Sequence, residues 1–414
     1  MTQQIQQNQP NLNFFGLGIA PKFLEILAKK KFTIPTPIQV KAIPAAIEGK
    51  DIVGIAQTGT GKTLAFAIPM LQRLMQQKGR GLIIAPTREL AIQIEEHYRI
   101  FVHSCGIRTA VLIGGASMYN QIQALRAGPR VIIATPGRLI DHIQQRNVHL
   151  GDVNILVLDE ADRMLDMGFA PQINQILETV PRERQTMLFS ATIPDEIVRI
   201  ATSYMKLPIK VEIARSGTAA EGITQEVFIV KREDKRQLIG KLLEQYKGSV
   251  LLFSRTKIGA SKITRALRTM GHRAAEIHSD RSLYQRREAL EGFKSGRYRI
   301  LVATDIAARG IDVSGIELVI NYDLPDEAEN YVHRIGRTGR AGQNGHAISF
   351  AEPEQGGEVR NIERLIRIPL PIRKHPELPA ETFVRTDVRH QSSRSQKRGQ
   401  RSYGHGGGYR HHRH

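Results

Sequence analysis

A glycine-rich run that could hold phosphates lies early in the chain. Residues 56–63 read Ala-Gln-Thr-Gly-Thr-Gly-Lys-Thr, between a short apolar segment and a segment with helical periodicity. Backbone N–H groups of such a loop can approach phosphate oxygens, and the following helix N-terminus adds positive partial charge. We expect Lys62 to reach the β- and γ-phosphates of a nucleotide and the Thr63 hydroxyl to ligate Mg²⁺. The predicted phosphate-binding residues are Gln57, Thr58, Gly59, Thr60, Gly61, Lys62 and Thr63.

Two adjacent carboxylates could complete this chemistry. Asp159 and Glu160 directly follow the apolar run 154–158. The carboxyl ends of parallel strands share one edge of a sheet, so this pair should lie beside the glycine-rich loop. Asp159 could then hold Mg²⁺ largely through water, while Glu160 orients and deprotonates an attacking water. Taken alone, a Gly-Lys-Thr run can occur by chance in a loop, and two adjacent carboxylates can lie on a solvated loop without a function. The presence of both features in one chain favours the catalytic interpretation.

The elements that position these residues alternate along the chain. Short β-branched runs are each followed by a longer segment with helical periodicity, which indicates parallel sheets covered by helices on both faces. We expect six strands in each half of the chain. They are 51–56, 81–85, 109–113, 130–134, 154–158 and 186–189, then 225–230, 249–253, 274–277, 299–303, 317–321 and 346–350.

Composition narrows the class of protein. The 414 residues suit two domains, and 41% hydrophobic residues suffice for packed cores. The net charge of +19 favours a polyanionic partner such as nucleic acid, although a basic surface could also serve solubility alone. A single cysteine, Cys105, excludes an intramolecular disulfide and is interpreted as an inert core residue. With no signal peptide or membrane-length apolar run, we expect a cytoplasmic protein without membrane contact.

Changes in composition set the expected boundaries. We expect a disordered N-terminus over 1–12, a first domain over 13–213, a flexible linker over 214–222 and a second domain over 223–370. The remainder, 371–414, should be a basic disordered tail. Its last part, 391–414, contains no acidic residue and carries Lys, Arg, His, Gly and Tyr, which suits a loose RNA tether or a solubilising tail.

The run Asp-Glu-Ala-Asp at 159–162, together with the glycine-rich loop, strongly resembles the DEAD-box family of superfamily 2 RNA helicases. The resemblance extends from about Phe14 to Phe350, with the family's motifs in order. It implies an α/β fold of two RecA-like domains and an RNA-stimulated ATPase that uses ATP and Mg²⁺. The compact core and short basic tail look similar to bacterial RhlE-type members, which implies ribosome assembly or RNA turnover, with ribosomal precursors or RNA-decay proteins as partners.

The resemblance also assigns roles around the nucleotide. The segment 32–39 looks like the Q motif, which implies that Gln39 reads the adenine edge and Phe32 packs on the ring, with Phe14 as the isolated upstream aromatic. Residues 331–340 match motif VI, so Arg337 and Arg340 correspond to arginine fingers. Asp312 would face the nucleotide. Asp162, Ser190, Thr192 and His333 would couple the two domains.

Further motifs imply an RNA path across both domains. They are strand–loop segments whose backbone N–H groups, hydroxyls and arginines can meet phosphates without reading bases. In the family's RNA-facing helix a Gln often stands three residues before an Arg; here Leu283 precedes Arg286, which puts that contact in doubt. The implied RNA-binding residues are Pro86, Thr87, Arg88, Gly115, Thr135, Gly137, Arg138, Arg255, Thr304 and Gly310.

The catalytic residues are thus expected on both domains, so hydrolysis should wait for domain closure. RNA and ATP would stabilise the same closed state, and local separation of short RNA duplexes, independent of sequence, is the expected activity. Two alternatives fit the same motifs. One is a superfamily 2 helicase or translocase acting on DNA, because the contacts that read the 2′-hydroxyl are not legible in the sequence. The other is an ATP-gated RNA clamp that does not unwind.

Overall fold

The computed structural model describes residues 13–56, 59–213, 222–308, 313, 315–339 and 345–384. Several predicted features lie outside these residues: Gln57, Thr58, Gly310, Asp312, Arg340, the termini 1–12 and 391–414, and nearly all of the linker 214–222.

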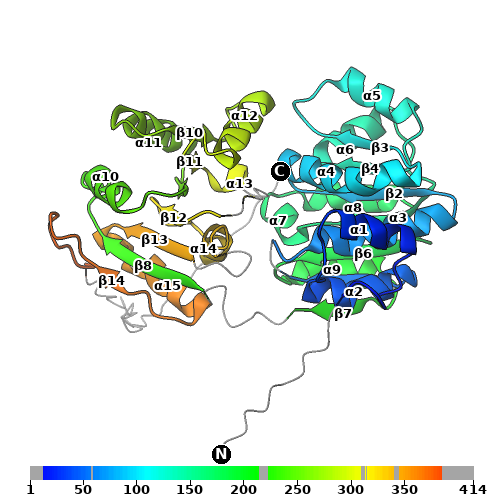
Figure 1. Ribbon diagram of the computed structural model, residues 1–414, viewed down its shortest axis with the longest axis horizontal. Coiled ribbons are helices and arrows are strands. Elements are labelled where there is room, and N and C mark those ends of the chain that lie inside the picture. The colour runs from blue at the N-terminus through cyan, green and yellow to red at the C-terminus, as the bar shows by residue number, and fades with distance from the viewer. Residues whose placement is uncertain are drawn as a thin grey trace, which may run out of the picture. The chain divides into compact units, whose positions relative to one another are not determined.

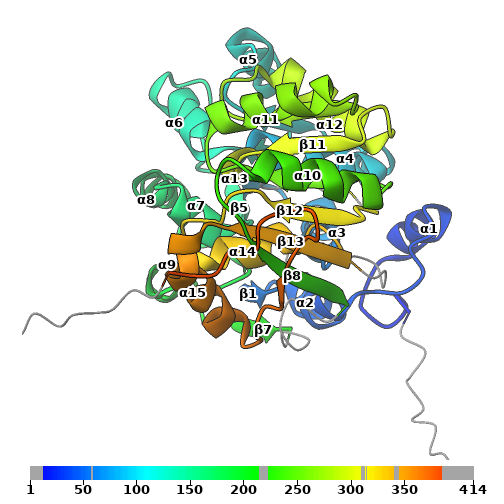
Figure 2. The same ribbon diagram turned by 90° about the vertical axis from the view of Figure 1, so that its left-hand side faces the viewer.

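The first half of the described chain forms a seven-stranded sheet in the order β3-β4-β2-β5-β6-β1-β7, and neighbouring strands run parallel. Figures 1 and 2 show helices on both of its faces. The strands are β1 (Ile52–Ile55), β2 (Arg80–Ile84), β3 (Thr109–Leu112), β4 (Val131–Ala134), β5 (Val153–Leu158), β6 (Gln185–Ser190) and β7 (Ile209–Glu212). The helices are α1 (Pro21–Lys29), α2 (Pro37–Ile47), α3 (Lys62–Gln76), α4 (Arg88–Cys105), α5 (Met118–Arg126), α6 (Pro136–Gln144), α7 (Ala161–Asp166), α8 (Ala170–Thr179) and α9 (Asp195–Tyr204).

Two apolar layers enclose this sheet. Ile155 and Val157 of β5 pack with α1–α4, while Leu156 and Leu158 pack with α6–α9. Successive strand residues point to opposite faces, so a strand covered on both sides must be apolar throughout. The predicted double burial of this run is confirmed.

The second half repeats the architecture. Its seven strands take the order β10-β11-β9-β12-β13-β8-β14, again parallel. Helices α10 and α11 cover one face, and α12, α14 and α15 cover the other. The strands are β8 (Ile223–Ile229), β9 (Val250–Phe253), β10 (Ala274–Ile277), β11 (Ile300–Ala303), β12 (Leu318–Asn321), β13 (Gly345–Ala351) and β14 (Ile372–Arg373). The helices are α10 (Lys235–Gln245), α11 (Lys257–Thr269), α12 (Leu283–Lys294), α13 (Asp305–Ala308), α14 (Ala328–Ile335) and α15 (Gly356–Ile366), with a 3₁₀ turn η1 (Pro353–Gln355).

Among the described residues, the second half continues past residue 370, which the sequence analysis gave as its end. Strand β14 pairs with β8, and Phe383 packs against Gly356. Lys231 and Lys241 form ion pairs with Glu381 (3.1 Å) and Glu377 (2.6 Å). The described chain is therefore anchored on this half as far as residue 383.

Cys105 and the lengths of the helices can be compared with the predictions made from composition. Cys105 is half-buried at the end of α4 rather than deep in the core, and burial raises the pKa of its thiol, which disfavours the reactive thiolate. Among the described residues, no helix combines the length and the apolar character that crossing a bilayer requires.

Candidate nucleotide site and RNA path

The glycine-rich loop joins β1 to α3 at the carboxyl edge of the first sheet. Gly59 and Gly61 have φ of +83° and +88°, a region that favours glycine, and Gly61 is the residue that caps α3. A Cβ atom on Gly61 would collide with Gln39 Nε2 and lie 2.9 Å from Thr36 Oγ1. Glycine at position 61 therefore lets the segment around Thr36 and Gln39 pack closely against the loop, which ends at the N-terminus of α3, where anions bind favourably.

Lys62 is the first residue of α3 and is only 6% exposed. Its Nζ has no hydrogen-bond partner among the described residues. An unpaired ammonium group is costly to bury, so a polar partner is expected at this position. A phosphate oxygen fits that requirement.

Asp159 and Glu160 follow β5 at the same edge and are buried. Glu160 adopts a left-handed backbone conformation (φ 52°, ψ 51°) that non-glycine residues seldom adopt. Two contacts hold it there: its N–H donates to Asp159 Oδ1 (3.0 Å), and its Oε2 lies 2.5 Å from Nη1 of Arg163. Strain of this kind is common at functional sites.

Burial and three nearby cations, Lys62, Arg163 and Arg337, determine the protonation of Asp159 and Glu160. Burial raises the pKa of Asp159 to about 6, against the opposing effect of Lys62. Burial also disfavours the Glu160 carboxylate, but Arg163, Lys62 and Arg337 outweigh it, so the pKa of Glu160 stays below its ordinary value. Glu160 is therefore ionised at neutral pH, as a base acting on water must be.

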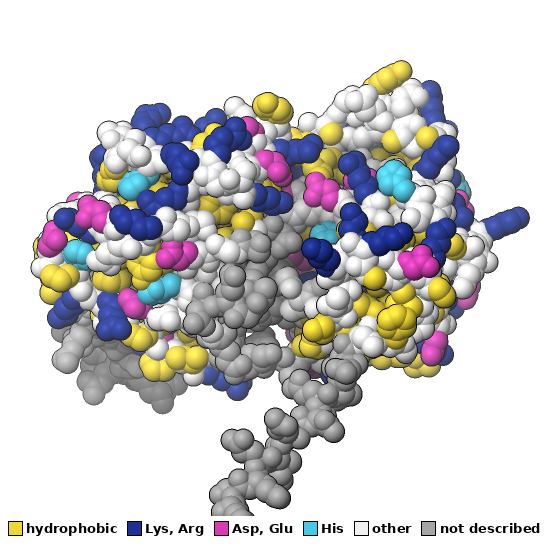
Figure 3. All heavy atoms as spheres, in the orientation of Figure 1, with side chains coloured by type: hydrophobic (Ala, Val, Ile, Leu, Met, Phe, Trp, Pro, Cys, Tyr) yellow, Lys and Arg dark blue, Asp and Glu magenta, His cyan; other side chains and the backbone are white. Residues whose placement is uncertain are grey.

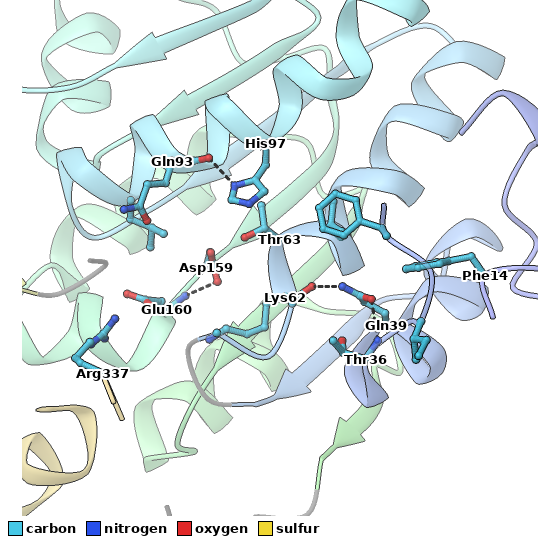
Figure 4. A pocket seen from close by; sticks show the side chains of 16 residues that line it. Phe14, Thr36, Gln39, Lys62, Thr63, Gln93, His97, Asp159, Glu160 and Arg337 are labelled. Atoms are coloured by element: carbon cyan, nitrogen blue, oxygen red, sulfur yellow. Dashed lines mark hydrogen bonds between the residues drawn. The ribbon is translucent and has the colours of Figure 1, made fainter. Parts of the chain in front are cut away.

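Arg337 brings the second half of the chain into this site. It follows α14, is 3% exposed and donates from Nε to the His333 carbonyl oxygen (3.3 Å). In Figure 4 its guanidinium points toward Glu160, with Lys62 on the opposite side of that carboxylate. All three line one cavity of about 260 Å³. The cavity is lined by Phe14, Phe32, Ile34, Thr36, Gln39, Gly59, Gly61, Lys62, Thr63, Leu64, Leu90, Gln93, His97, Asp159, Glu160 and Arg337.

The three residues predicted to surround the adenine, Phe14, Phe32 and Gln39, line this same cavity. The Gln39 amide has a structural role that the sequence did not reveal. Its Oε1 accepts from the N–H of Thr36 (2.9 Å), and its Nε2 donates to the carbonyl of Gly61 (3.0 Å). One N–H and one lone pair of the amide remain for a base edge. Adenine recognition by Gln39 therefore stays a prediction, now combined with a direct link to the glycine-rich loop.

Three of the four predicted coupling residues, Asp162, Ser190 and Thr192, meet in a hydrogen-bonded cluster. Asp162 Oδ2 accepts from the backbone N–H and the hydroxyl of Thr192 (2.9 and 3.1 Å), while Ser190 Oγ accepts from the Asp162 N–H (3.3 Å). The end of β6 is thereby tied to α7. On α14, burial and then Arg163 lower the pKa of His333 to about 4, so His333 is neutral near pH 7.

Three predicted RNA segments lie at the ends of β2, β3 and β4, which are neighbours in the sheet. Thr87 caps α4 by accepting from the Leu90 N–H (3.2 Å). The Arg88 guanidinium lies over the loop after β3, because a Cβ atom on Gly114 would be 3.1 Å from Arg88 Nη2. Arg138 donates to the carbonyl of Ala116 in that loop (3.1 Å). The other predicted residues of these segments are Pro86, Gly115, Thr135 and Gly137, of which Gly115 and Gly137 are exposed.

The second half places its described RNA candidates at the ends of β9 and β11. Arg255 is exposed and pairs with Asp326 (3.2 Å), while Thr304 follows β11 and is half-buried. Arg286 forms a buried ion pair with Glu89 of the first half (2.7 Å). Leu283, at the position where Gln is usual, packs against the apolar cluster of the first half. Helix α12, to which both residues belong, thus contacts the first half through an ion pair and an apolar side chain.

Sequence reasoning missed several residues of the site. Arg163 was not singled out, although its spacing of three from Glu160 on a helix is a recognisable pairing signal. Gln93 and His97 of α4 line the cavity, with His97 Nδ1 2.8 Å from the Gln93 carbonyl oxygen. Nothing in their local sequence distinguishes them from an ordinary amphipathic helix.

Comparisons with known proteins agree with this geometry. The family model for DEAD/DEAH box helicases matches residues 36–200, and the model for the helicase conserved C-terminal domain matches residues 234–342. Together they cover more than half of the chain. It belongs to the DEAD-box helicase family.

Three relatives show how far this helicase resembles known members. The ATP-dependent RNA helicase CshA of Listeria monocytogenes is 44% identical over 84% of this chain and 68% of its own length. The ATP-dependent rRNA helicase RRP3 of Meyerozyma guilliermondii is 39% identical over 92% of this chain and 81% of its own. Among solved structures, S. cerevisiae Dbp5 bound to RNA and ADP BeF3 has a TM-score of 0.78 at 31% identity, covering 87% of this chain and 95% of that one.

Proposed function

We propose that this DEAD-box protein is an ATP-dependent RNA helicase whose active site is completed by its second half, and that it separates short RNA duplexes locally and without sequence preference. The observation that carries the proposal is the shared cavity: Lys62, Asp159 and Glu160 come from one half of the chain and Arg337 from the other. ATP hydrolysis then depends on the contact between the two halves.

Each side chain of the cavity has a role that its surroundings suit. Lys62, buried with no hydrogen-bond partner among the residues that the structure describes, would bind the β- and γ-phosphates of ATP. Glu160, held ionised, would orient the attacking water and accept its proton. Arg337, next to Glu160, would stabilise the charge that develops on the γ-phosphate, and Arg340 is expected to assist. Phe14, Phe32 and Gln39 would surround the adenine.

A magnesium ion would fit beside Thr63 and Asp159. The described residues contain no cluster of three or more His, Cys, Asp or Glu side chains able to hold a metal. Mg²⁺ at this position would therefore take most of its ligands from water and phosphate oxygens, as it commonly does in phosphoryl-transfer enzymes. When bound, the ion would neutralise charge on the phosphates, and it would favour the ionised form of Asp159.

RNA binding would use the loops at the ends of β2, β3 and β4. The exposed Gly115 and Gly137 would present their N–H groups to phosphates, while Arg88 and Arg138 add charge; Thr87 and Thr135 are buried, so their contacts with RNA stay predictions. Figure 3 shows Lys and Arg side chains on both halves of the visible face, with Asp and Glu among them. Backbone contacts carry no base information, which favours sequence-independent binding. Thr304, Gly310 and Arg255 would extend the path into the second half.

ATP and RNA would be positively coupled because each contacts both halves. A ligand that binds only the joined arrangement stabilises it, and by linkage each ligand then strengthens binding of the other. Loss of the γ-phosphate after hydrolysis removes the contact with Arg337 and releases the RNA. The cluster of Asp162, Ser190 and Thr192, together with His333 of α14, would couple these events.

The test is RNA-stimulated phosphate release combined with release of a labelled strand from a short duplex. We expect both activities in the wild-type protein with Mg²⁺ and neither after its chelation. Glu160→Gln should lower phosphate release about 10²-fold or more, because it removes the base without changing shape. Wild-type turnover in this variant would contradict the role of Glu160.

The same assay separates the alternatives. Equal stimulation by matched DNA and RNA oligonucleotides would indicate a nucleic acid translocase without RNA preference. Phosphate release without strand release would indicate an ATP-gated clamp.

A cytoplasmic location, an RhlE-type membership and a role in ribosome assembly or RNA turnover stay predictions. So does the use of residues 391–414 as an RNA tether. Crosslinking of the protein to RNA in cells would identify its targets directly.

A further inference from the structure

Two buried polar side chains lie next to the Gly114–Gly115 loop, away from the nucleotide cavity. Gln121, in the first turn of α5, is 5% exposed, and His142 of α6 is fully buried. His142 Nε2 lies 3.1 Å from Gln121 Oε1. A buried polar network is costly unless it is satisfied, so this pair needs a structural or functional reason.

The Gln121 amide holds the loop at both ends. Its Nε2 donates to the carbonyl of Ile113 (3.0 Å) and more weakly to the carbonyl of Ala116 (3.4 Å). These two residues flank Gly114 and Gly115, the loop that lies under Arg88. The Ala116 carbonyl also accepts from Arg138 (3.1 Å). One side chain thus connects the loop after β3 to the arginine that follows β4.

Only one orientation of this network is favourable. The NH₂ group of Gln121 must face the two carbonyl oxygens, because the reverse orientation would oppose its Oε1 to both. Oε1 then faces His142, whose Nε2 must carry a hydrogen. Burial, followed by the charge of Arg138, lowers the pKa of His142 against the effect of Asp141, so the neutral Nε2–H form suits the site.

We infer that Gln121 and His142 are positioning residues for RNA binding: they hold the Gly114–Gly115 loop and Arg138 in the arrangement that receives the phosphate backbone. This inference rests on the proposed RNA path. A loop that is ordered before RNA arrives does not pay the entropy of ordering on binding. Neither side chain lines the nucleotide cavity, so their effect should be confined to RNA.

The test measures RNA-stimulated ATPase as a function of RNA and of ATP concentration. Gln121→Glu places a second oxygen against the two carbonyl groups, and His142→Leu removes the donor to Gln121. Each should raise the KM for RNA about tenfold, as expected for the loss of a buried hydrogen bond that orders a binding loop. The KM for ATP should change less than about twofold. Gln123→Glu, an exposed position on the same helix, gives the same change of charge and should behave as wild type.

A conservative variant separates positioning from packing. His142→Gln places an amide N–H near the position of Nε2–H, while Leu has a similar bulk and no donor. We expect His142→Gln to keep the KM for RNA near the wild-type value. Equal losses in the Leu and Gln variants would overturn the positioning role in favour of packing alone. This comparison decides the matter even if Gln121→Glu fails to fold.

Arg138→Ala in the same assay distinguishes the inference from the RNA path on which it rests. If Arg138→Ala leaves the KM for RNA unchanged, the proposed path is wrong and the inference fails with it. If Arg138→Ala raises this KM while Gln121→Glu and His142→Leu do not, the path stands and the positioning role is refuted.

Discussion

Lys62 and Lys235 occupy matching places in two sheets that share one strand order. Each is the first residue of the helix that follows the first strand of its half, α3 after β1 and α10 after β8. In the second half, Lys235 Nζ lies 3.2 Å from Asp323, which follows β12 as Asp159 follows β5, and 2.9 Å from Glu352. In the first half, Lys62 has no hydrogen-bond partner among the described residues.

The difference suggests which features of the first sheet would make it bind a nucleotide, as proposed. Both sheets bring a lysine and a carboxylate together at the carboxyl edge. The second half satisfies them internally, since Asp323 also accepts from Ser254 and from the Arg255 N–H (3.2 and 3.0 Å), and its β8–α10 turn contains no glycine. The first half has the glycine-rich loop and leaves Lys62 for a ligand. Arg337 is the one described residue of the second half that lines the cavity, and in the proposed function it is the residue through which this half contributes to catalysis.

The largest expected effect concerns that contribution. Arg337→Ala removes the cation next to Glu160 and should lower the RNA-stimulated kcat about 10³-fold or more, since an arginine supplied by a second domain stabilises charge that forms only in the transition state. ATP affinity should fall much less. Single-turnover phosphate release would measure the first quantity and nucleotide titration the second. Arg364→Ala, an exposed arginine on α15, serves as the control. A loss of less than tenfold would mean that the second half is not part of the active site.

Substitution of Lys62 and of Lys235 should have different effects, one on ATP binding and the other on stability. Lys62→Ala should abolish productive ATP binding, seen as a rise in KM or a loss of turnover, with little change in the unfolding midpoint. Lys235→Met, at a side chain that is 1% exposed, should destabilise the protein by about 2 kcal/mol, because two carboxylates lose their partner. Urea unfolding and ATP titration of both variants would compare them. Impaired ATP binding of Lys235→Met with an unchanged free energy of unfolding would contradict the structural role given to Lys235.

A smaller effect is expected from the ion pair between the halves. Glu89→Arg or Arg286→Glu alone should weaken the coupling between ATP and RNA about tenfold, as two like charges then face each other in a buried contact. The double variant restores opposite charges and should recover part of the loss. The measurement is the RNA affinity with and without an ATP analogue. Additive losses in the double variant would show that the pair does not form in solution.

The sequence predicted most of the fold because burial on both faces requires continuous apolar runs. All six strands expected in each half are present, within one or two residues at their ends. The two that were missed, β7 and β14, lie at sheet edges. Val211 is the one buried residue of β7, and β14 is two residues long, so neither carries a periodic signal.

The site was predictable where chemistry demands particular residue types and unpredictable where it depends on packing. The glycines, Lys62 and the carboxylates follow from what phosphates and water require. The link from Gln39 to Gly61, the Glu160–Arg163 pair and the Gln121–His142 pair depend on contacts between segments far apart or on side-chain direction. No spacing rule in one sequence identifies the Gln39–Gly61 link or the Gln121–His142 pair; the spacing of three does suggest the Glu160–Arg163 pair, but it does not show that the pair is buried in the site.

In the proposed mechanism, the active site is complete only when the two halves meet. Dyes on Glu178→Cys in α8 and Arg360→Cys in α15, both exposed, with Cys105→Ser, would report the distance between the halves by single-molecule energy transfer. We expect ATP analogue and single-stranded RNA together to convert a broad distribution into one narrow population of high transfer efficiency, and neither ligand alone to do so fully. An unchanged distribution with both ligands present would contradict the claim.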